Sequence, residues 1–221
     1  MTKRILVWDV PTRIFHWLLA LSFIGAYVTA ESERYRVIHV VLGYTLLGLL
    51  VFRLVWGFSG TRYARFRSFL FKPAEIAAYT FSLLKGKPAH YVGHNPLGSV
   101  AIWLLLGLGI ATSVTGVMVF EDIGGDVLEE LHEWISNALL AVVLLHITGV
   151  IASSVLQREN LPRAMITGYK KAEADKAIKR SYLWLGAILL AAVLAFWVIY
   201  PSTGLVTSGT ESAHTKHHDD D

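Results

Sequence analysis

The chain has 221 residues, of which 54% are hydrophobic and only 17% are charged. Soluble domains carry roughly 25% charged residues, so this chain has too little charge to cover a globule in water, and we expect it to lie in a lipid bilayer. Its net charge of +3 does not indicate nucleic-acid binding, because the basic residues are scattered between apolar runs. The lack of cysteine excludes disulfides, thiolate metal sites, iron–sulfur clusters and covalently attached c-type haem.

Five charge-poor stretches are candidates for membrane helices, which need about 20 apolar residues. We predict spans over about 10–30, 37–58, 97–120, 130–156 and 181–200. Between the second and third spans, residues 73–84 form a mildly amphipathic segment that begins with proline, and we expect a helix on the cytoplasmic surface there.

Basic residues concentrate on one side of the predicted membrane, and the positive-inside rule makes this the cytoplasmic side. Of the 20 Lys and Arg residues, only Arg34, Arg36 and Lys216 fall on the opposite side. We therefore expect a cytoplasmic N-terminus and an external C-terminus, which in a bacterium faces the periplasm.

Four histidines lie inside the predicted spans or in their first turns, where ionisable side chains are costly and usually face the bundle interior. They are His16, His39, His132 and His146. His132 and His146 face nearly the same side of one helix and are about 21 Å apart along its axis. By the same rise per residue, His39 matches the depth of His132 near the outer surface, and His16 matches His146 near the cytoplasm.

Two histidines at one depth on different helices suit a planar haem, whose iron has axial sites on opposite faces. We predict two b-type haems, an outer one bound by His39 and His132 and an inner one bound by His16 and His146. Such ligation leaves no open position on the iron, so the haems would carry electrons. Arg53 shares a helix face with His39 near the inner haem, where it either pairs with a haem propionate or reaches the membrane surface as a positive anchor.

Several segments together resemble the bacterial cytochrome b561 superfamily, which includes the b-type cytochrome subunits of membrane-bound nickel–iron hydrogenases. They are residues 9–17 (DVPTRIFHW), 93–98 (GHNPLG), Thr115-Gly116, the two histidines of the fourth span and residues 159–170 (ENLPRAMITGYK). The likeness extends from about residue 5 to 200. It implies a four-helix core that binds two haems through the four histidines, and electron transfer between a periplasmic redox partner and membrane quinone in the bacterial inner membrane.

We thus expect residues 1–200 to form an all-α integral membrane domain, a four-helix haem-binding bundle with a fifth transmembrane helix. The protein would be an electron-transfer subunit of a quinone-linked oxidoreductase rather than a self-contained enzyme. Its partners would be a hydrogenase or a cytochrome c in the periplasm, quinone and membrane lipid, and the sequence is compatible with a homo-oligomer. The alternatives are a divalent-metal transporter, against which the carboxylate-free span interiors argue, and a haem-containing anchor subunit without active relay.

Three further features have two interpretations each. Asn95 and Pro96 predict a helix cap. His94 beside them either belongs to this capping motif, or lies near the inner haem or helps to deliver protons to quinone. The acidic run 121–133 is a docking surface or an ordinary solvated loop. Residues 201–221 are expected to be a disordered periplasmic tail, and their His214, His217, His218 and final aspartates are either solvated or bind a metal ion.

Overall fold

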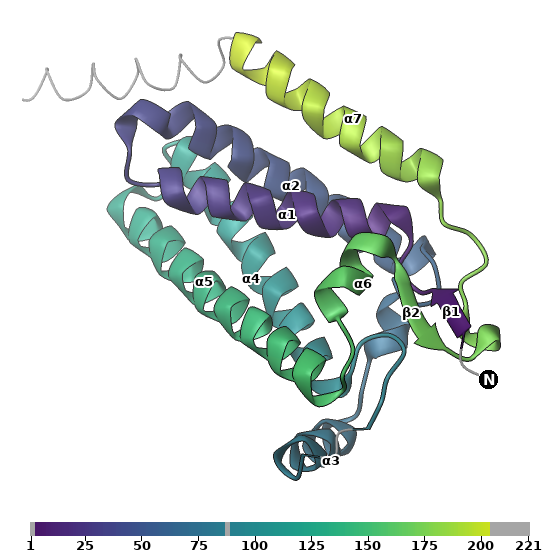
Figure 1. The fold of residues 1–221 in the computed structure, drawn as a ribbon. Helices are drawn as coiled ribbons and strands as arrows, with labels where there is room; N and C mark the ends of the chain where they lie inside the picture. Colours follow the sequence, from purple (N-terminus) through teal and green to yellow (C-terminus); the bar gives the residue numbers. More distant parts are fainter. Residues whose placement is uncertain (1–2, 87–88, 204–221) are drawn as a thin grey trace, which may run out of the picture.

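The computed structural model describes residues 3–86 and 89–203 (Figure 1). Most of this part of the chain is helical. The long helices are α1 (Val10–Thr29), α2 (Arg36–Ser59), α4 (Pro96–Phe120), α5 (Gly125–Leu156) and α7 (Leu183–Ile199). The shorter elements are α3 (Pro73–Leu84), α6 (Leu161–Thr167), β1 (Lys3–Leu6), β2 (Tyr169–Ala172) and single 3₁₀ turns over Glu33–Tyr35, Phe66–Phe69, Ala174–Lys176 and Tyr200–Thr203.

Three helices begin with the same signature, an Asp or Asn followed within two residues by proline. The side chains of Asp9, Asn95 and Asn160 each accept a hydrogen bond from the backbone N–H three residues later. Such a side-chain oxygen satisfies an otherwise unpaired N–H of the first turn, where proline is tolerated because it lacks one. The capping role predicted for Asn95 is confirmed, and α3 begins at Pro73 as predicted.

The long helices pack as a series of neighbours. α1 packs on α2, α2 on α4 and α4 on α5. Leu18 and Leu49 lie in the core between α1 and α2, and Leu50 and Leu106 join α2 to α4. In the described chain, α5 has no comparably close backbone packing against α1 or α2. Side chains bridge these helices instead: the Tyr27 hydroxyl of α1 donates to Asn137 Oδ1 of α5 at 2.7 Å.

Helix α7 lies on the outer side of the bundle against α1 (Figure 1). The two helices approach closely at Gly186, where a Cβ would lie 2.5 Å from Cγ1 of Val10. Near the other end of α7, the indole N–H of Trp197 donates to Thr45 Oγ1 of α2 at 2.9 Å. The fifth predicted span therefore packs on the bundle without entering its centre.

Three helices of the described chain are long and apolar enough to cross a membrane: Glu33–Ser59, which is α2 with its preceding turn, α4 and α5. Helix α7 is apolar but has 17 residues. Helix α1 has 20 residues but carries Arg13 and His16, and it is not in this set. The predicted five spans, and the arrangement of four helices plus one, are therefore not confirmed and stay predictions.

A small antiparallel sheet joins the start of the chain to the segment after α6. β1 pairs with β2 from Lys3 opposite Ala172 to Leu6 opposite Tyr169. The Gly168 carbonyl then accepts hydrogen bonds from the N–H groups of the two residues that follow β1, at 2.9 and 3.1 Å. Only glycine fits this position, because its φ is +86° and a Cβ would lie 2.7 Å from a backbone carbonyl oxygen. The prediction of an all-α chain was wrong in this detail, since four-residue strands far apart in the sequence leave no local pattern.

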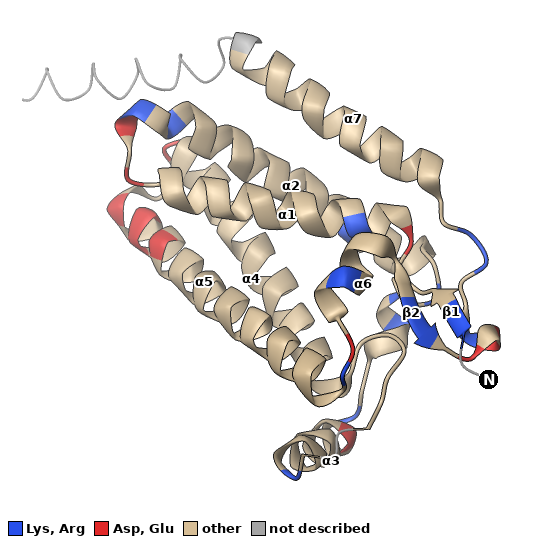
Figure 2. Cartoon of the chain, in the orientation of Figure 1, with Lys and Arg blue, Asp and Glu red and all other residues tan. Residues whose placement is uncertain are grey.

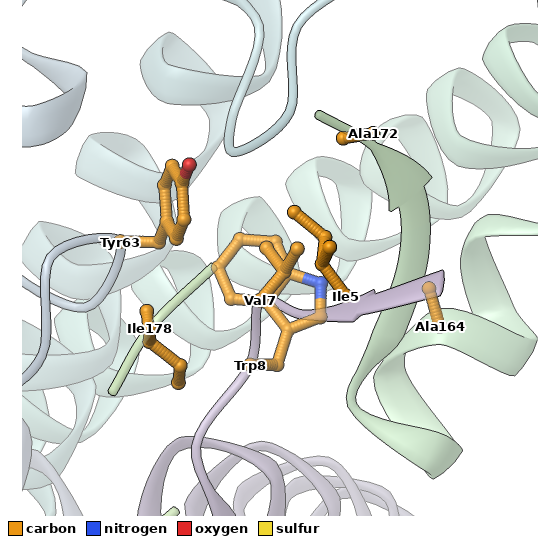
Figure 3. Close-up of a cluster of buried hydrophobic side chains, with 7 residues drawn as sticks. All are labelled: Ile5, Val7, Trp8, Tyr63, Ala164, Ala172 and Ile178. Atoms are coloured by element: carbon orange, nitrogen blue, oxygen red, sulfur yellow. The ribbon is translucent and has the colours of Figure 1, made fainter. Parts of the chain in front are cut away.

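Beside the sheet lies a cluster of buried hydrophobic side chains (Figure 3). Trp8 and Tyr63 meet edge to face with ring centroids 6.3 Å apart, and the Tyr63 hydroxyl donates to the Lys176 carbonyl at 2.8 Å. Because its members come from segments far apart in the chain, the cluster holds the loop after α2 and the 160–180 region against the start of α1. The cluster consists of Ile5, Val7, Trp8, Tyr63, Ala164, Ala172 and Ile178.

Charged residues gather toward the two ends of the helical bundle (Figure 2). One end, which we call the acidic end, carries the acidic residues of the α4–α5 turn and the start of α5. The opposite end, which we call the basic end, carries Lys and Arg of β1, β2 and α6. The His/Asp tail considered as a metal site lies outside the described residues.

Candidate functional site

Two of the four predicted ligands, His39 and His132, meet at the acidic end. His39 lies in the first turn of α2 and His132 near the start of α5, and their ring centroids are 6.3 Å apart with planes at 84°. Two imidazoles that bind one metal ion from opposite sides, each at about 2 Å from a ring nitrogen, have ring centres about 6 Å apart. The spacing of this acidic-end pair therefore suits axial ligands on the two faces of one haem.

Hydrogen bonding determines which nitrogen of His39 is free to bind metal. Its Nδ1 lies 2.8 Å from the backbone carbonyl oxygen of Ala26 in α1. Because a carbonyl oxygen only accepts, the hydrogen must be on Nδ1, and the lone pair is then on Nε2. Metal-binding histidines nearly always donate their second ring N–H in this way.

His132 is oriented by α4. Its Nδ1 lies 3.0 Å from Thr115 Oγ1, and the backbone carbonyl of Thr112 also interacts with the ring. The Thr115 hydroxyl donates its own hydrogen within α4, to Ala111 O at 2.9 Å, with Thr112 O at 3.1 Å. Thr115 therefore accepts from Nδ1–H of His132, which again leaves Nε2 for a metal.

The other two predicted ligands, His16 of α1 and His146 of α5, lie toward the basic end and are near enough to interact electrostatically. The ring of His16 packs edge to face against Trp17, with centroids 5.1 Å apart. Within the described chain, Nδ1 of His16 is buried without a hydrogen-bond partner. This basic-end pair thus differs from the acidic-end pair in how its rings are held.

The helix packing suits a group inserted between the members of each pair. Both pairs join α5 to α1 or α2, the helices against which α5 has no close backbone packing. All four histidines are half-buried, as expected of side chains that line a space. A Cβ at Gly43 of α2 or Gly149 of α5 would meet nothing within 4 Å. These features fit two planar macrocycles, each with two histidine ligands.

Comparison with known proteins agrees with this geometry. The family model described as prokaryotic cytochrome b561 matches residues 7–168, a region that contains all four histidines. The chain belongs to the prokaryotic cytochrome b561 family. Membership of a b-type cytochrome family implies haem b as the cofactor and electron transfer as the activity.

Similar proteins are named as probable B-type cytochrome subunits of Ni/Fe hydrogenases. The one from Azotobacter vinelandii is 26% identical over 77% of this chain and 90% of its own. The one from Rhizobium leguminosarum bv. viciae is 28% identical over 75% and 88%, and that of Ni/Fe-hydrogenase 1 from Escherichia coli K12 is 22% identical over 77% and 92%. No solved structure matches the chain.

Arg53 of this cytochrome is buried inside the protein and does not reach outward. It is 5% exposed, it donates to the Ala64 carbonyl at 2.9 Å, and its guanidinium lies over the Phe66 and Phe69 rings at 4.9 and 5.8 Å. No carboxylate forms an ion pair with it among the residues that the structure describes. The position contradicts the membrane-surface anchor. The buried carboxylate of Asp9 interacts electrostatically with Arg53, and pairing with a haem propionate stays a prediction.

Asp9 is a buried positioning residue that the sequence analysis did not single out. Its carboxylate is fully buried and accepts from Thr12 N at 2.8 Å, from Trp56 Nε1 at 3.3 Å and from Thr61 Oγ1. It thereby ties the start of α1 to the end of α2, and so positions His16, two turns further along α1. The Asp-x-Pro signature predicts the cap, but the contacts to α2 are long-range and have no local signal.

His94 lies between the Trp8 and Phe69 rings, with both centroids 4.8 Å away. Burial lowers its pKa to about 3, because a charged imidazole would lose its hydration, and the positive charges of Arg53 and Lys170 add to this effect. The ring also interacts electrostatically with His16 and His146. His94 is therefore neutral and lies close to the basic-end pair, and its predicted part in proton delivery stays a prediction.

The acidic run covers the α4–α5 turn and the start of α5, where its members lie from six residues before His132 to the residue after it. Asp126, Glu129, Glu130 and Glu133 are exposed, and Glu129 interacts electrostatically with His132. An exposed row of carboxylates at the end of a bundle offers a surface to a basic partner. Both sequence-based interpretations of this run stay open.

Proposed function

We propose that this member of the cytochrome b561 family is a dihaem subunit that relays electrons across a membrane between a periplasmic redox partner and quinone. His39 and His132 would bind one haem, and His16 and His146 the other. Bound haem supplies reversible one-electron chemistry, while the protein supplies position and potential. Two histidines on each iron leave no position for oxygen or substrate, which suits electron transfer.

The observation that carries the proposal is the acidic-end pair. Its centroid spacing of 6.3 Å fits an iron between the rings, and both Nδ1 atoms face acceptors. A histidine that served only helix packing would need one such bond and no opposed partner. For a divalent-metal transporter we expect a cluster of three or more ligands, and among the described residues no three His, Asp or Glu side chains gather in that way.

Arg53 would bind a propionate of the basic-end haem. Its side chain is held by one hydrogen bond and two aromatic faces, so the fork of N–H groups is oriented in advance. Arginine pairs with carboxylates through such parallel bonds, and burial strengthens the attraction. We expect Arg53→Leu to weaken retention of the basic-end haem alone.

The proposed direction across the membrane rests on charge. By the positive-inside rule the basic end would lie in the cytoplasm, and the acidic end, with His39 and His132, would then face the periplasm of a bacterial inner membrane. The relatives named as hydrogenase cytochrome subunits favour a hydrogenase as the periplasmic partner, with a cytochrome c as the alternative. Quinone as the second partner rests on the family resemblance.

Haem content and its loss in single variants test the proposal. Purified protein should contain about two extractable haems per chain and give the reduced-minus-oxidised spectrum of a b-type cytochrome. His39→Ala and His132→Ala should each remove the same spectral component, while His16→Ala and His146→Ala should each remove the other, because each haem needs both of its ligands.

His90→Ala is the matched control. His90 is half-exposed near Glu159, with Nε2 3.6 Å from Oε2, and lies in neither pair, so this variant should keep both haems. If His39→Ala and His132→Ala removed different components, the pairing would be wrong. Protein that binds no haem after reconstitution would reject the function itself.

A further inference from the structure

The two histidine pairs differ in the hydrogen bonds to their Nδ1 atoms. In the acidic-end pair, His39 donates to the Ala26 carbonyl, and His132 donates to Thr115, with the Thr112 carbonyl close by. In the basic-end pair, Nδ1 of His16 is buried and has no acceptor in the described part of the protein.

This difference changes how strongly the imidazoles donate electrons to iron. An imidazole whose N–H is bound by an acceptor becomes a more basic ligand through its other nitrogen. A more basic ligand stabilises Fe(III) more than Fe(II), so the midpoint potential of that haem falls. Hydrogen bonds to axial ligands are accordingly one of the means by which a protein sets haem potential.

The charge beside the acidic-end pair acts in the same direction. Negative charge stabilises Fe(III), and Glu129 interacts with His132 at the acidic end. Positive charge stabilises Fe(II), and Arg53 and Lys170 lie near His94, which is itself near His16 and His146. Lys170 is almost fully buried and paired with Glu159 at 3.0 Å, and Arg53 interacts electrostatically with Asp9, so both cations have a negative neighbour and the charge contrast rests on Glu129.

We propose that Thr115 is a positioning residue that, together with the Ala26 carbonyl, gives the acidic-end haem a lower midpoint potential than the basic-end haem. This inference rests on the proposed function, because it requires one haem at each pair. An electron on the acidic-end iron then passes downhill: that iron is oxidised from Fe(II) to Fe(III), and the basic-end iron is reduced from Fe(III) to Fe(II). No bond forms or breaks, and no proton moves.

Thr115 is the member of this arrangement that mutation can test, because Ala26 and Thr112 act through backbone carbonyls. Thr115→Val keeps the shape of the side chain and removes the acceptor. Thr115→Ser keeps the hydroxyl and serves as the conservative variant. Ser113→Ala is the matched control, since Ser113 Oγ is a buried hydroxyl of the same helix with no hydrogen-bond partner among the described residues.

The experiment is a potentiometric titration of each haem-loaded protein in detergent, followed by the reduced-band absorbance of its two components. Titration of His39→Ala, which should lack the acidic-end haem, assigns the components. Thr115→Val should raise the lower potential only, with a reduced-to-oxidised ratio at fixed potential about three to ten times higher, tenfold being about 59 mV for one electron. Thr115→Ser and Ser113→Ala should titrate like the parent protein, and all should hold two haems.

Two results would overturn the inference while the proposed function stands. One is a Thr115→Val protein with two haems and an unchanged lower potential. The other is a lower-potential component that survives in His39→Ala and disappears in His16→Ala. If Thr115→Val loses the acidic-end haem, Thr115→Ala, which also lacks the hydroxyl acceptor, is titrated in its place, and an unchanged lower potential in that variant equally rejects the role. A parent protein with fewer than two haems rejects the proposed function, and the inference with it.

Discussion

Under the proposed haem assignment, replacing Gly116 by alanine should weaken binding of the acidic-end haem, because the added methyl group would push against His132, one of its proposed ligands. Gly116 of α4 faces His132, and a Cβ at this position would lie 2.9 Å from Cε1 and 3.4 Å from Nδ1 of that ring. Carbon atoms in contact prefer about 3.5 to 4.0 Å. The His132 ring has little freedom to move away, because its Nδ1 is hydrogen-bonded to Thr115, the residue before Gly116 in α4.

The size of the effect follows from the cost of one extra carbon in a packed site. Overpacking of this kind costs about 1 to 3 kcal/mol. If the strain is relieved by moving His132 off the iron, the affinity of the acidic-end haem falls by about fivefold to 150-fold. Affinity at the basic-end pair should not change, because His146 lies about 21 Å further along α5.

The assay is transfer of haem from the purified protein to an excess of a haem-scavenging apoprotein, followed optically over time. Gly116→Ala should release about half of its haem faster than the parent protein, and a reduced-minus-oxidised spectrum should assign the loss to the component that His39→Ala also lacks. Gly107→Ala is the control, since Gly107 is in the same helix and its Cβ would meet nothing within 4 Å. Equal release from both alanine variants would refute the argument.

Three other outcomes are expected. Asp9→Ala should lower the free energy of unfolding by about 3 to 5 kcal/mol, because buried donors on α1 and α2 lose a charged acceptor. Melting of the haem-loaded protein in detergent measures this loss, and an unchanged melting temperature would contradict the prediction. Acidification from pH 7 to 5 should lower the free energy of unfolding by about 2 kcal/mol, since His94 takes up a proton near pH 6.5 in the unfolded chain but, with its pKa lowered to about 3, does not in the folded one. His94→Phe should remove this part of the pH dependence of melting, and an equally steep dependence in that variant would disprove the assignment. Neutralising Glu129, Glu130 and Glu133 should slow reduction by the native donor at low salt without loss of haem, because exposed charges are screened within about 10 Å at 0.1 M ionic strength; a rate insensitive to salt and to these changes would leave the run as a solvated loop.

The histidine pairing was accessible from the sequence because helix geometry converts residue spacing into depth. The positions of His39 and His132 alone predict that they meet, and their rings are 6.3 Å apart. The caps at Asn95 and Asn160 were equally accessible, since both depend on residues within one turn. Local rules are sufficient wherever the physical cause acts along a single helix.

What the sequence could not predict depends on contacts between distant segments. Arg53 has the same local pattern whether its side chain reaches the membrane surface or turns inward, and the Phe66 and Phe69 rings that hold it lie beyond a loop. Thr115 resembles any threonine of a membrane helix until α5 brings His132 to its hydroxyl. The strand pairing near Gly168 likewise requires the complete tertiary fold.

The pairing of β1 with β2 affects how the protein is made. β1 is synthesised before α1, but its partner β2 is synthesised only after α1, α2, α4, α5 and α6. Contacts between residues so far apart in sequence close late, because the entropy of a long loop opposes them. During translation β1 therefore has no partner until helices α1 to α6 have been made, and the β1–β2 pairing forms only after these helices are in place. A bulky tag fused ahead of Lys3 should slow this last step and leave nascent chains open to proteases for longer.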